Sequence, residues 1–143
     1  MRANKKNTGG ACRTFTPLLS VLYDEMEEDE DLKDTFEVVY VSSDDTEEMC
    51  NKYMNEKHSN WLRIPFAGNA RHDLKLKYGV FAGKERNDFP PTTQRRSGIP
   101  TLVVVGKDGT EHELLDCDDS KVIRDIESKG TEFLDEWLEK YKW

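Results

Sequence analysis

The chain contains three cysteines and three histidines in 143 residues, and no apolar run approaches the length of a membrane span. So small and odd a set of cysteines argues against a secreted disulfide scaffold and fits a reducing intracellular compartment, cytoplasmic or nuclear. No charged-then-apolar signal peptide opens the chain, and a membrane partner is not expected. Acidic residues outnumber basic ones by 29 to 21, for a net charge of −8, so a nucleic-acid partner is not expected either.

Metal and cofactor chemistry has no recognisable motif. His58, His72 and His112 lack paired-cysteine spacing, so no metal site is expected. No Ser/His/Asp motif or phosphate-cradling glycine loop is present, and we expect no cofactor.

Apolar spacing predicts one domain over residues 12–143, preceded by an unstructured leader over residues 1–11. The predicted order is helix, strand, helix, helix, strand, strand and helix, which indicates an α/β sandwich with a mixed sheet. The helices are predicted to begin near residues 17, 43, 70 and 119, with a continuation from residue 131, and the strands to cover residues 36–42, 98–105 and 111–115. Residues 81–97 show no periodicity and are expected to form a long loop.

The stretch Cys12–Pro17 is the most informative part of the chain. Thr16 is a plausible N-cap and Pro17 suits the first position of a helix. A cysteine held just before a helix feels its positive end, which favours the thiolate needed for redox chemistry. A second redox cysteine would stand three residues earlier, and that position holds Gly9.

The other two cysteines have less distinctive surroundings. Cys50 falls on the apolar face of the second predicted helix, where Asp45 and Glu48 are spaced as a capping box, and a role as a small core residue is favoured over a redox role. Neither Cys50 nor Cys117 has a predicted position that brings it near Cys12.

Three ordered segments, Cys12–Pro17, Trp61–Phe66 and Gly98–Leu102, together resemble the nucleoredoxin and tryparedoxin branch of the thioredoxin fold. In that family the first segment reads Trp-Cys-Pro-Pro-Cys-Arg-x-Phe-Thr-Pro. The resemblance covers roughly residues 12–116. It implies a thioredoxin-like three-layer sandwich and a thiol–disulfide oxidoreductase, a protein-disulfide reductase acting on protein or small-molecule disulfides and thiols.

The resemblance also assigns site residues. Alignment on the Phe-Thr-Pro end places Cys12 on the second, resolving cysteine and Gly9 on the missing nucleophile. Ile99 and Pro100 match the segment that presents backbone to the substrate, with the proline typically cis. A two-cysteine cycle within the Gly9–Cys12 loop is therefore impossible.

A second departure from the family pattern concerns the sheet. The family's strand before the cysteine motif lies at the sheet centre, and residues 1–11 contain no apolar run that could form it. This indicates an altered N-terminus: a truncated or spliced product, or a mispredicted start. Three readings remain open: a reductase family member impaired in this chain, a non-catalytic protein-binding module using the groove beside Pro100 and the loop over residues 81–97, and a monothiol redox protein using Cys12.

Overall fold

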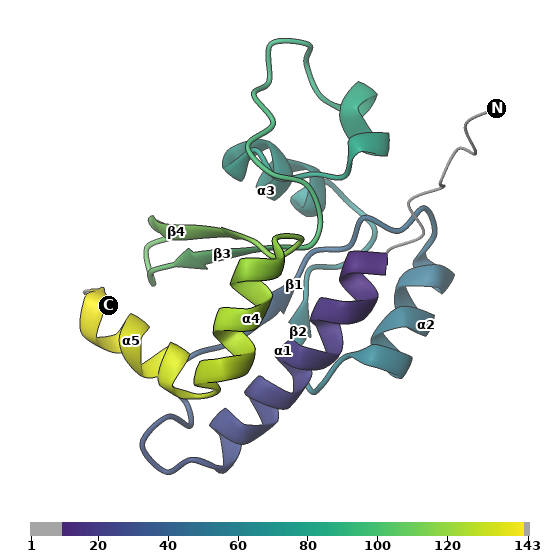
Figure 1. The fold of residues 1–143 in the computed structure, drawn as a ribbon. Helices are drawn as coiled ribbons and strands as arrows, with labels where there is room; N and C mark the ends of the chain where they lie inside the picture. The colour runs from purple at the N-terminus through teal and green to yellow at the C-terminus, as the bar shows by residue number, and fades with distance from the viewer. Residues whose placement is uncertain (1–9, 142–143) are drawn as a thin grey trace, which may run out of the picture.

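The computed structural model describes residues 10–141 (Figure 1). The helices and strands follow the predicted order, with a short strand over residues 62–63 and a short 3-10 helix over residues 83–88 in addition. In chain order they are α1 (Gly10–Glu28), β1 (Val39–Tyr40), α2 (Glu47–Lys57), β2 (Leu62–Arg63), α3 (Ala70–Tyr78), the 3-10 helix η1 (Gly83–Asp88), β3 (Thr101–Val105), β4 (Glu111–Asp116), α4 (Ser120–Lys129) and α5 (Glu132–Lys140). None of these helices combines the length and apolarity needed to cross a membrane.

The strands form two separate pairs. β3 and β4 make an antiparallel hairpin, as the Lys-Asp-Gly-Thr turn predicts, with Gly109 at φ 80° in the turn. β1 and β2 run parallel, because the Leu62 N–H donates to the Val38 carbonyl at 3.1 Å and the Ile64 N–H to the Tyr40 carbonyl at 2.9 Å. The described strands therefore form two small sheets, one parallel and one antiparallel, in place of one continuous mixed sheet.

The strand expected over residues 36–42 is shorter and less buried than predicted. Two residues are extended and paired, and the side chain of Val39 is 48% exposed. Among residues 10–141, no ladder joins β1 to β3. The described part of the chain begins with α1, so the expected loss of a preceding strand lies outside it.

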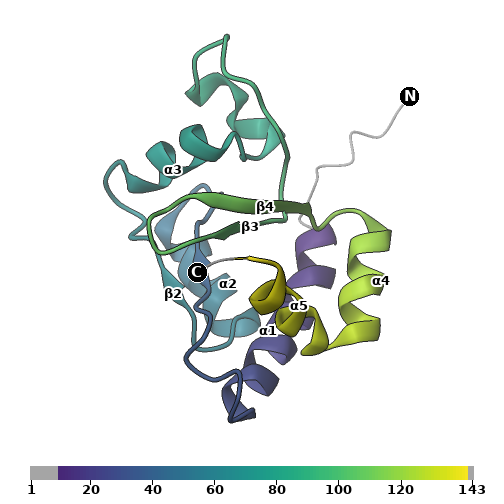
Figure 2. The same ribbon diagram turned by 90° about the vertical axis from the view of Figure 1, so that its left-hand side faces the viewer.

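Helices lie on both sides of the β3–β4 hairpin (Figures 1 and 2). α1, α4 and α5 lie on one side, and α3 with η1 lies on the other. α1 supplies the largest share of the packed core through an apolar stripe at helical spacing, which joins residues of α4, α5 and the turn after β4 in one cluster. The stripe consists of Phe15, Leu19, Leu22, Tyr23 and Met26.

The first helix begins earlier than the sequence predicts. It starts at Gly10, so Pro17 lies inside it and Thr16 is not its N-cap. Proline leaves the carbonyl four residues earlier without its usual N–H partner, yet the helix continues. Contacts from α2 hold the preceding turn, as described below, and they outweigh the local signal. Two residues expected in the leader are helical, and residues 1–9 lie outside the described residues.

The ends of the other helices agree in part with the residues that the sequence places there. α2 is capped by Thr46, whose hydroxyl accepts from the Met49 N–H at 3.2 Å, and not by Asp45. α3 ends at Gly79 in the left-handed region that glycine favours. Asp119 caps α4 through the Lys121 N–H, at the predicted start of that helix. The loop over residues 81–97 contains η1, so it is more ordered than its lack of periodicity indicates.

Candidate functional site

Cys12 lies in the first turn of α1, and a tyrosine from α2 holds that turn. The Tyr53 hydroxyl donates to the Cys12 carbonyl at 3.2 Å and lies 2.6 Å from the Thr16 hydroxyl. Because a tyrosine has one hydroxyl proton, Thr16 is the donor in the second bond when Tyr53 donates to Cys12. Two hydrogen bonds from a residue 37 positions away from Thr16 therefore fix the start of α1 against α2.

The half-buried Cys12 thiol lies in an environment that disfavours its ionised form. Burial raises the pKa of Cys12 above its ordinary value, and the negative charges of Asp118 and Asp44 raise it further, while a backbone hydrogen bond acts in the opposite direction. The pKa of Cys12 thus shifts in the direction opposite to the one expected at a helix N-terminus, because burial and the two carboxylates raise it.

Asp44 is held close to this site by the loop that follows β1. Its carboxylate accepts from the Ser42 hydroxyl at 2.8 Å, and its backbone N–H donates back to the same hydroxyl at 3.0 Å. The carbonyl of Ser42 in turn accepts from the Lys75 ammonium at 2.8 Å. Lys75 of α3 thus holds the loop that carries Ser42 and Asp44.

The lysine that fixes the loop is itself buried and paired. Lys75 forms an ion pair with Glu85 of η1, and Glu85 also accepts from the Ser43 hydroxyl at 2.6 Å and the Ala82 N–H at 2.9 Å. Burial raises the pKa of Glu85, but these hydrogen bonds outweigh it and hold the pKa below its usual range. A buried charge is tolerated here because Lys75, Ser43 and the Ala82 N–H all donate hydrogen bonds to the Glu85 carboxylate. Sequence reasoning missed this pair, because Lys75 is one of several charged residues on α3 and its partner Glu85 belongs to another element.

Ile99 and Pro100 lie at the start of β3, next to the end of β4. Their peptide bond is cis, and Ile99 is 36% exposed. The Pro100 carbonyl accepts from the Cys117 N–H at 3.0 Å, which continues the register that pairs Thr101 with Asp116. The predicted substrate segment therefore lies directly beside Cys117.

Cys117 follows β4 and is fully buried, with its sulfur 3.4 Å from the Leu115 carbonyl oxygen. Burial raises the pKa of Cys117 to about 12, and the charge of Asp116 raises it further. The prediction that Cys117 lies away from Cys12 stays a prediction.

The third cysteine is also buried. Cys50 is 1% exposed on the inner face of α2, with its sulfur 3.9 Å from an Arg63 guanidinium nitrogen. The prediction of a core role for Cys50 is confirmed. Gly9, the position of the missing nucleophile, lies outside the described residues.

An aromatic cluster that the sequence did not reveal supports Tyr53. The His58 ring packs against Tyr40, Tyr53 and Trp61 with centroid distances of 4.3, 5.2 and 4.4 Å. Burial lowers the pKa of His58 to about 4, with Asp44 acting weakly in the opposite direction, so the ring is neutral at pH 7. A neutral imidazole among aromatic rings is a packing residue that fixes α2 on β1 and β2.

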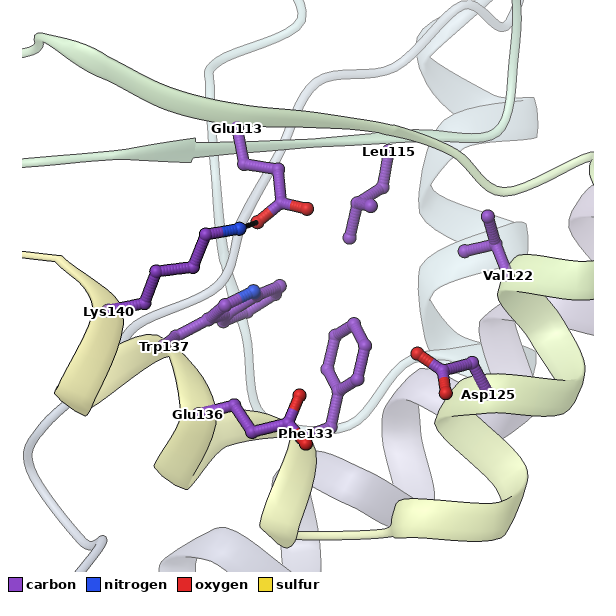
Figure 3. A pocket seen from close by; sticks show the side chains of 8 residues that line it. All are labelled: Glu113, Leu115, Val122, Asp125, Phe133, Glu136, Trp137 and Lys140. Carbon is purple, nitrogen blue, oxygen red and sulfur yellow. Dashed lines mark ion pairs between the residues drawn. The ribbon is translucent and has the colours of Figure 1, made fainter.

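A separate hollow of about 130 Å³ lies between β4, α4 and α5 (Figure 3). Phe133 and Trp137 line it together with Glu113, and the Lys140 ammonium lies 3.6 Å from the Glu113 carboxylate. None of the residues predicted for the site lines this hollow. This hollow is therefore separate from the predicted thiol site.

Comparison with known proteins agrees with the geometry. A family model described as Thioredoxin-like matches residues 5–111. The chain is 25% identical over 131 residues to "Probable nucleoredoxin 1" of Arabidopsis thaliana, covering 92% of this chain and 21% of that protein. It is 30% identical over 99 residues to the nucleoredoxin of Danio rerio, covering 68% of this chain and 19% of that protein. The chain thus spans about a fifth of the length of these curated relatives.

A solved structure gives the same result for the fold. The crystal structure of thioredoxin from Wuchereria bancrofti superposes with a TM-score of 0.56 at 31% sequence identity, covering 92% of this chain and 74% of that one. The family model covers most of the chain, and the structural neighbour shares the fold as well as the family. The chain therefore belongs to the thioredoxin-like family, within its nucleoredoxin branch, and is a member of the thiol oxidoreductase family.

Proposed function

We propose that this chain is a nucleoredoxin-like protein whose protein-disulfide reductase activity is impaired. One observation carries the proposal: the thiol retained at the family's cysteine motif, Cys12, is half-buried beside two carboxylates that raise its pKa. Thiol–disulfide exchange starts from the thiolate, so a raised pKa lowers the reactive fraction at neutral pH.

The missing second thiol supports the same conclusion. Gly9 occupies the position that the family resemblance assigns to the attacking cysteine. Without a thiol there, a substrate disulfide must be attacked by the more buried partner of the usual pair. We therefore expect slow exchange, and no rapid cycle within the loop.

The exposure of Ile99 supports a second reading, a non-catalytic binding role. Ile99 belongs to the predicted substrate segment, is 36% exposed just before β3, and offers an apolar contact to a bound peptide. The proposed partners are protein or small-molecule disulfides and thiols, in an intracellular, cytoplasmic or nuclear setting.

An insulin reduction assay with a dithiol reductant tests the main proposal. The unmodified chain is compared with Gly9→Cys, which restores the attacking thiol, and with Cys12→Ser, which removes the retained one. We expect turnover by Gly9→Cys and none above the Cys12→Ser background by the unmodified chain. Turnover by the unmodified chain that Cys12→Ser abolishes contradicts impairment and favours the monothiol reading.

A further inference from the structure

Two consecutive arginines precede the predicted substrate segment, and their guanidinium groups have different partners. Arg96 forms a bidentate ion pair with the Glu111 carboxylate, with both nitrogen–oxygen distances at 2.6 Å. Arg95 is exposed, and within residues 10–141 its guanidinium pairs with no carboxylate. Its Nε–H donates to the Phe81 carbonyl at 2.9 Å. The N–H groups on both Nη atoms of Arg95 are therefore available to a ligand.

The neighbours of the Arg95 guanidinium set its position. In addition to the hydrogen bond to Phe81, the guanidinium carbon lies 5.9 Å from the centroid of the buried Phe81 ring. Gly98 lies next to Nη2, because a Cβ added at Gly98 would clash with that atom. The guanidinium thus lies beside residue 98, one position before the exposed Ile99. A side chain that is already held in place loses less conformational freedom when it binds a ligand.

Hydrogen bonds also fix the backbone that joins Arg95 to the substrate segment. The Phe81 N–H donates to the Ser97 carbonyl at 3.3 Å, and the Thr101 hydroxyl donates to the Gly98 carbonyl at 2.7 Å. The Thr101 hydroxyl also lies 2.8 Å from the Ser97 hydroxyl. The protein itself therefore sets the spacing between the guanidinium and the substrate segment, before any ligand binds.

An unpaired guanidinium beside an exposed apolar side chain matches a ligand that carries a carboxylate beside an apolar group. A guanidinium binds a carboxylate through charge-assisted hydrogen bonds, which are stronger than those between neutral groups. We propose that Arg95 binds a carboxylate of the partner that docks at Ile99 and Pro100, so that the site prefers peptides with an acidic residue next to an apolar one. The inference rests on the proposed function, because it takes residues 99–100 as the segment that meets the partner.

The charge of the whole chain makes such a preference local. The net charge of −8 repels an acidic peptide, so the peptide gains affinity only where a cation is unpaired. Two other cations of this loop already have partners: Lys84 pairs with Asp45 at 3.1 Å, and the Arg86 guanidinium donates to the Thr93 carbonyl at 2.8 Å. A preference for acidic peptides that depends on Arg95 therefore reports binding at this residue.

The test titrates the isotope-labelled full chain with two capped peptides, Ser-Val-Glu-Ser-Val-Gly and Ser-Val-Gln-Ser-Val-Gly, and follows binding by NMR. Neither peptide contains cysteine, so binding is measured without thiol exchange. The amide signals of Gly98 and Ile99 and the Nε–H signal of Arg95 report where the peptide binds. We expect the glutamate peptide to bind about threefold more tightly than the glutamine peptide, as an exposed ion pair would give.

Arg95→Gln should abolish the difference between the two peptides. Arg96→Gln is the matched control: it removes the same charge one position away, from an arginine already paired with Glu111, and should keep the difference. Equal affinity of the unmodified chain for the two peptides, or binding of neither, overturns the proposal even if a variant folds poorly. A preference that persists in Arg95→Gln, or is lost equally in Arg96→Gln, also overturns it. Insulin turnover by the unmodified chain contradicts the impaired reductase alone, so the two proposals fail separately.

Discussion

Removing one hydroxyl, in Tyr53→Phe, tests whether α2 fixes the turn that carries Cys12. The ring stays, so its packing against Tyr40 and His58 is retained, while the bonds at 3.2 Å to Cys12 and 2.6 Å to Thr16 are lost. Each such bond contributes about 0.5–1.5 kcal/mol net, and the Thr16 hydroxyl, in a side chain only 7% exposed, loses this partner.

We therefore expect Tyr53→Phe to lower the free energy of unfolding by about 1.5 kcal/mol, which corresponds to a fall in Tm of about 5 °C for a chain of this size. Urea denaturation followed by circular dichroism measures the loss. Because the loosened turn exposes Cys12, its rate of alkylation by iodoacetamide should also rise relative to Cys50.

The matched control is Tyr23→Phe, further along α1. The Tyr23 hydroxyl donates to Glu37 at 3.2 Å, so its removal costs stability without touching the first turn. Faster alkylation of Cys12 is expected in Tyr53→Phe alone. If Tyr53→Phe keeps the stability and the Cys12 reactivity of the unmodified chain, the two hydrogen bonds do not hold the helix start and the reasoning is refuted.

Further predictions concern the charges and turns around the site. The rate of Cys12 alkylation by iodoacetamide should rise about tenfold per pH unit from pH 7 to 9, and a plateau below pH 9 contradicts the raised pKa. At pH 7 the rate should be higher in Asp118→Asn than in the unmodified chain. The pKa of His58 is lowered to about 4 in the folded chain, so as the pH falls the unfolded chain takes up a proton on His58 before the folded chain does. The free energy of unfolding should therefore fall from about pH 6.5 towards pH 4. In urea titrations His58→Phe should flatten this fall, and the control His72→Gln, at an exposed site, should not. Glu85→Gln leaves Lys75 buried without its counter-charge and should cost about 3 kcal/mol of unfolding free energy, whereas a loss below about 0.5 kcal/mol means the pair is solvated. Gly79→Ala places a Cβ 2.8 Å from the Gln94 carbonyl at φ 67° and should lower Tm more than Gly68→Ala, which has φ 87° and open space; equal effects contradict the clash.

Residues next to the helix ends predicted some helix boundaries, and contacts between residues far apart in the sequence determined others. The end of α3 at Gly79 and the cap of α4 at Asp119 follow from residues next to the helix ends, so sequence patterns found them. The start of α1 did not follow the Thr16–Pro17 signal, because Tyr53, far away in the chain, stabilises the turn before it.

The candidate site shows the same division. The resemblance of three short segments to a known family nominated Cys12, Ile99 and Pro100 as site residues. The hydrogen bond between the Cys117 N–H and the Pro100 carbonyl joins residues 17 positions apart, and no local pattern predicts it. The net effect on the Cys12 thiol likewise comes from Asp118 and Asp44, which belong to other elements.

The separation of the strands into two ladders has a consequence for how the molecule opens. Among residues 10–141, the β1–β2 pair and the β3–β4 hairpin share no backbone hydrogen bonds, so side-chain packing around α1 couples them. Such a molecule can lose amide-exchange protection in one ladder while the other stays protected, so the two ladders open as separate cooperative units. Amide exchange should then report two opening free energies, with the five-residue β3 outlasting the two-residue β1.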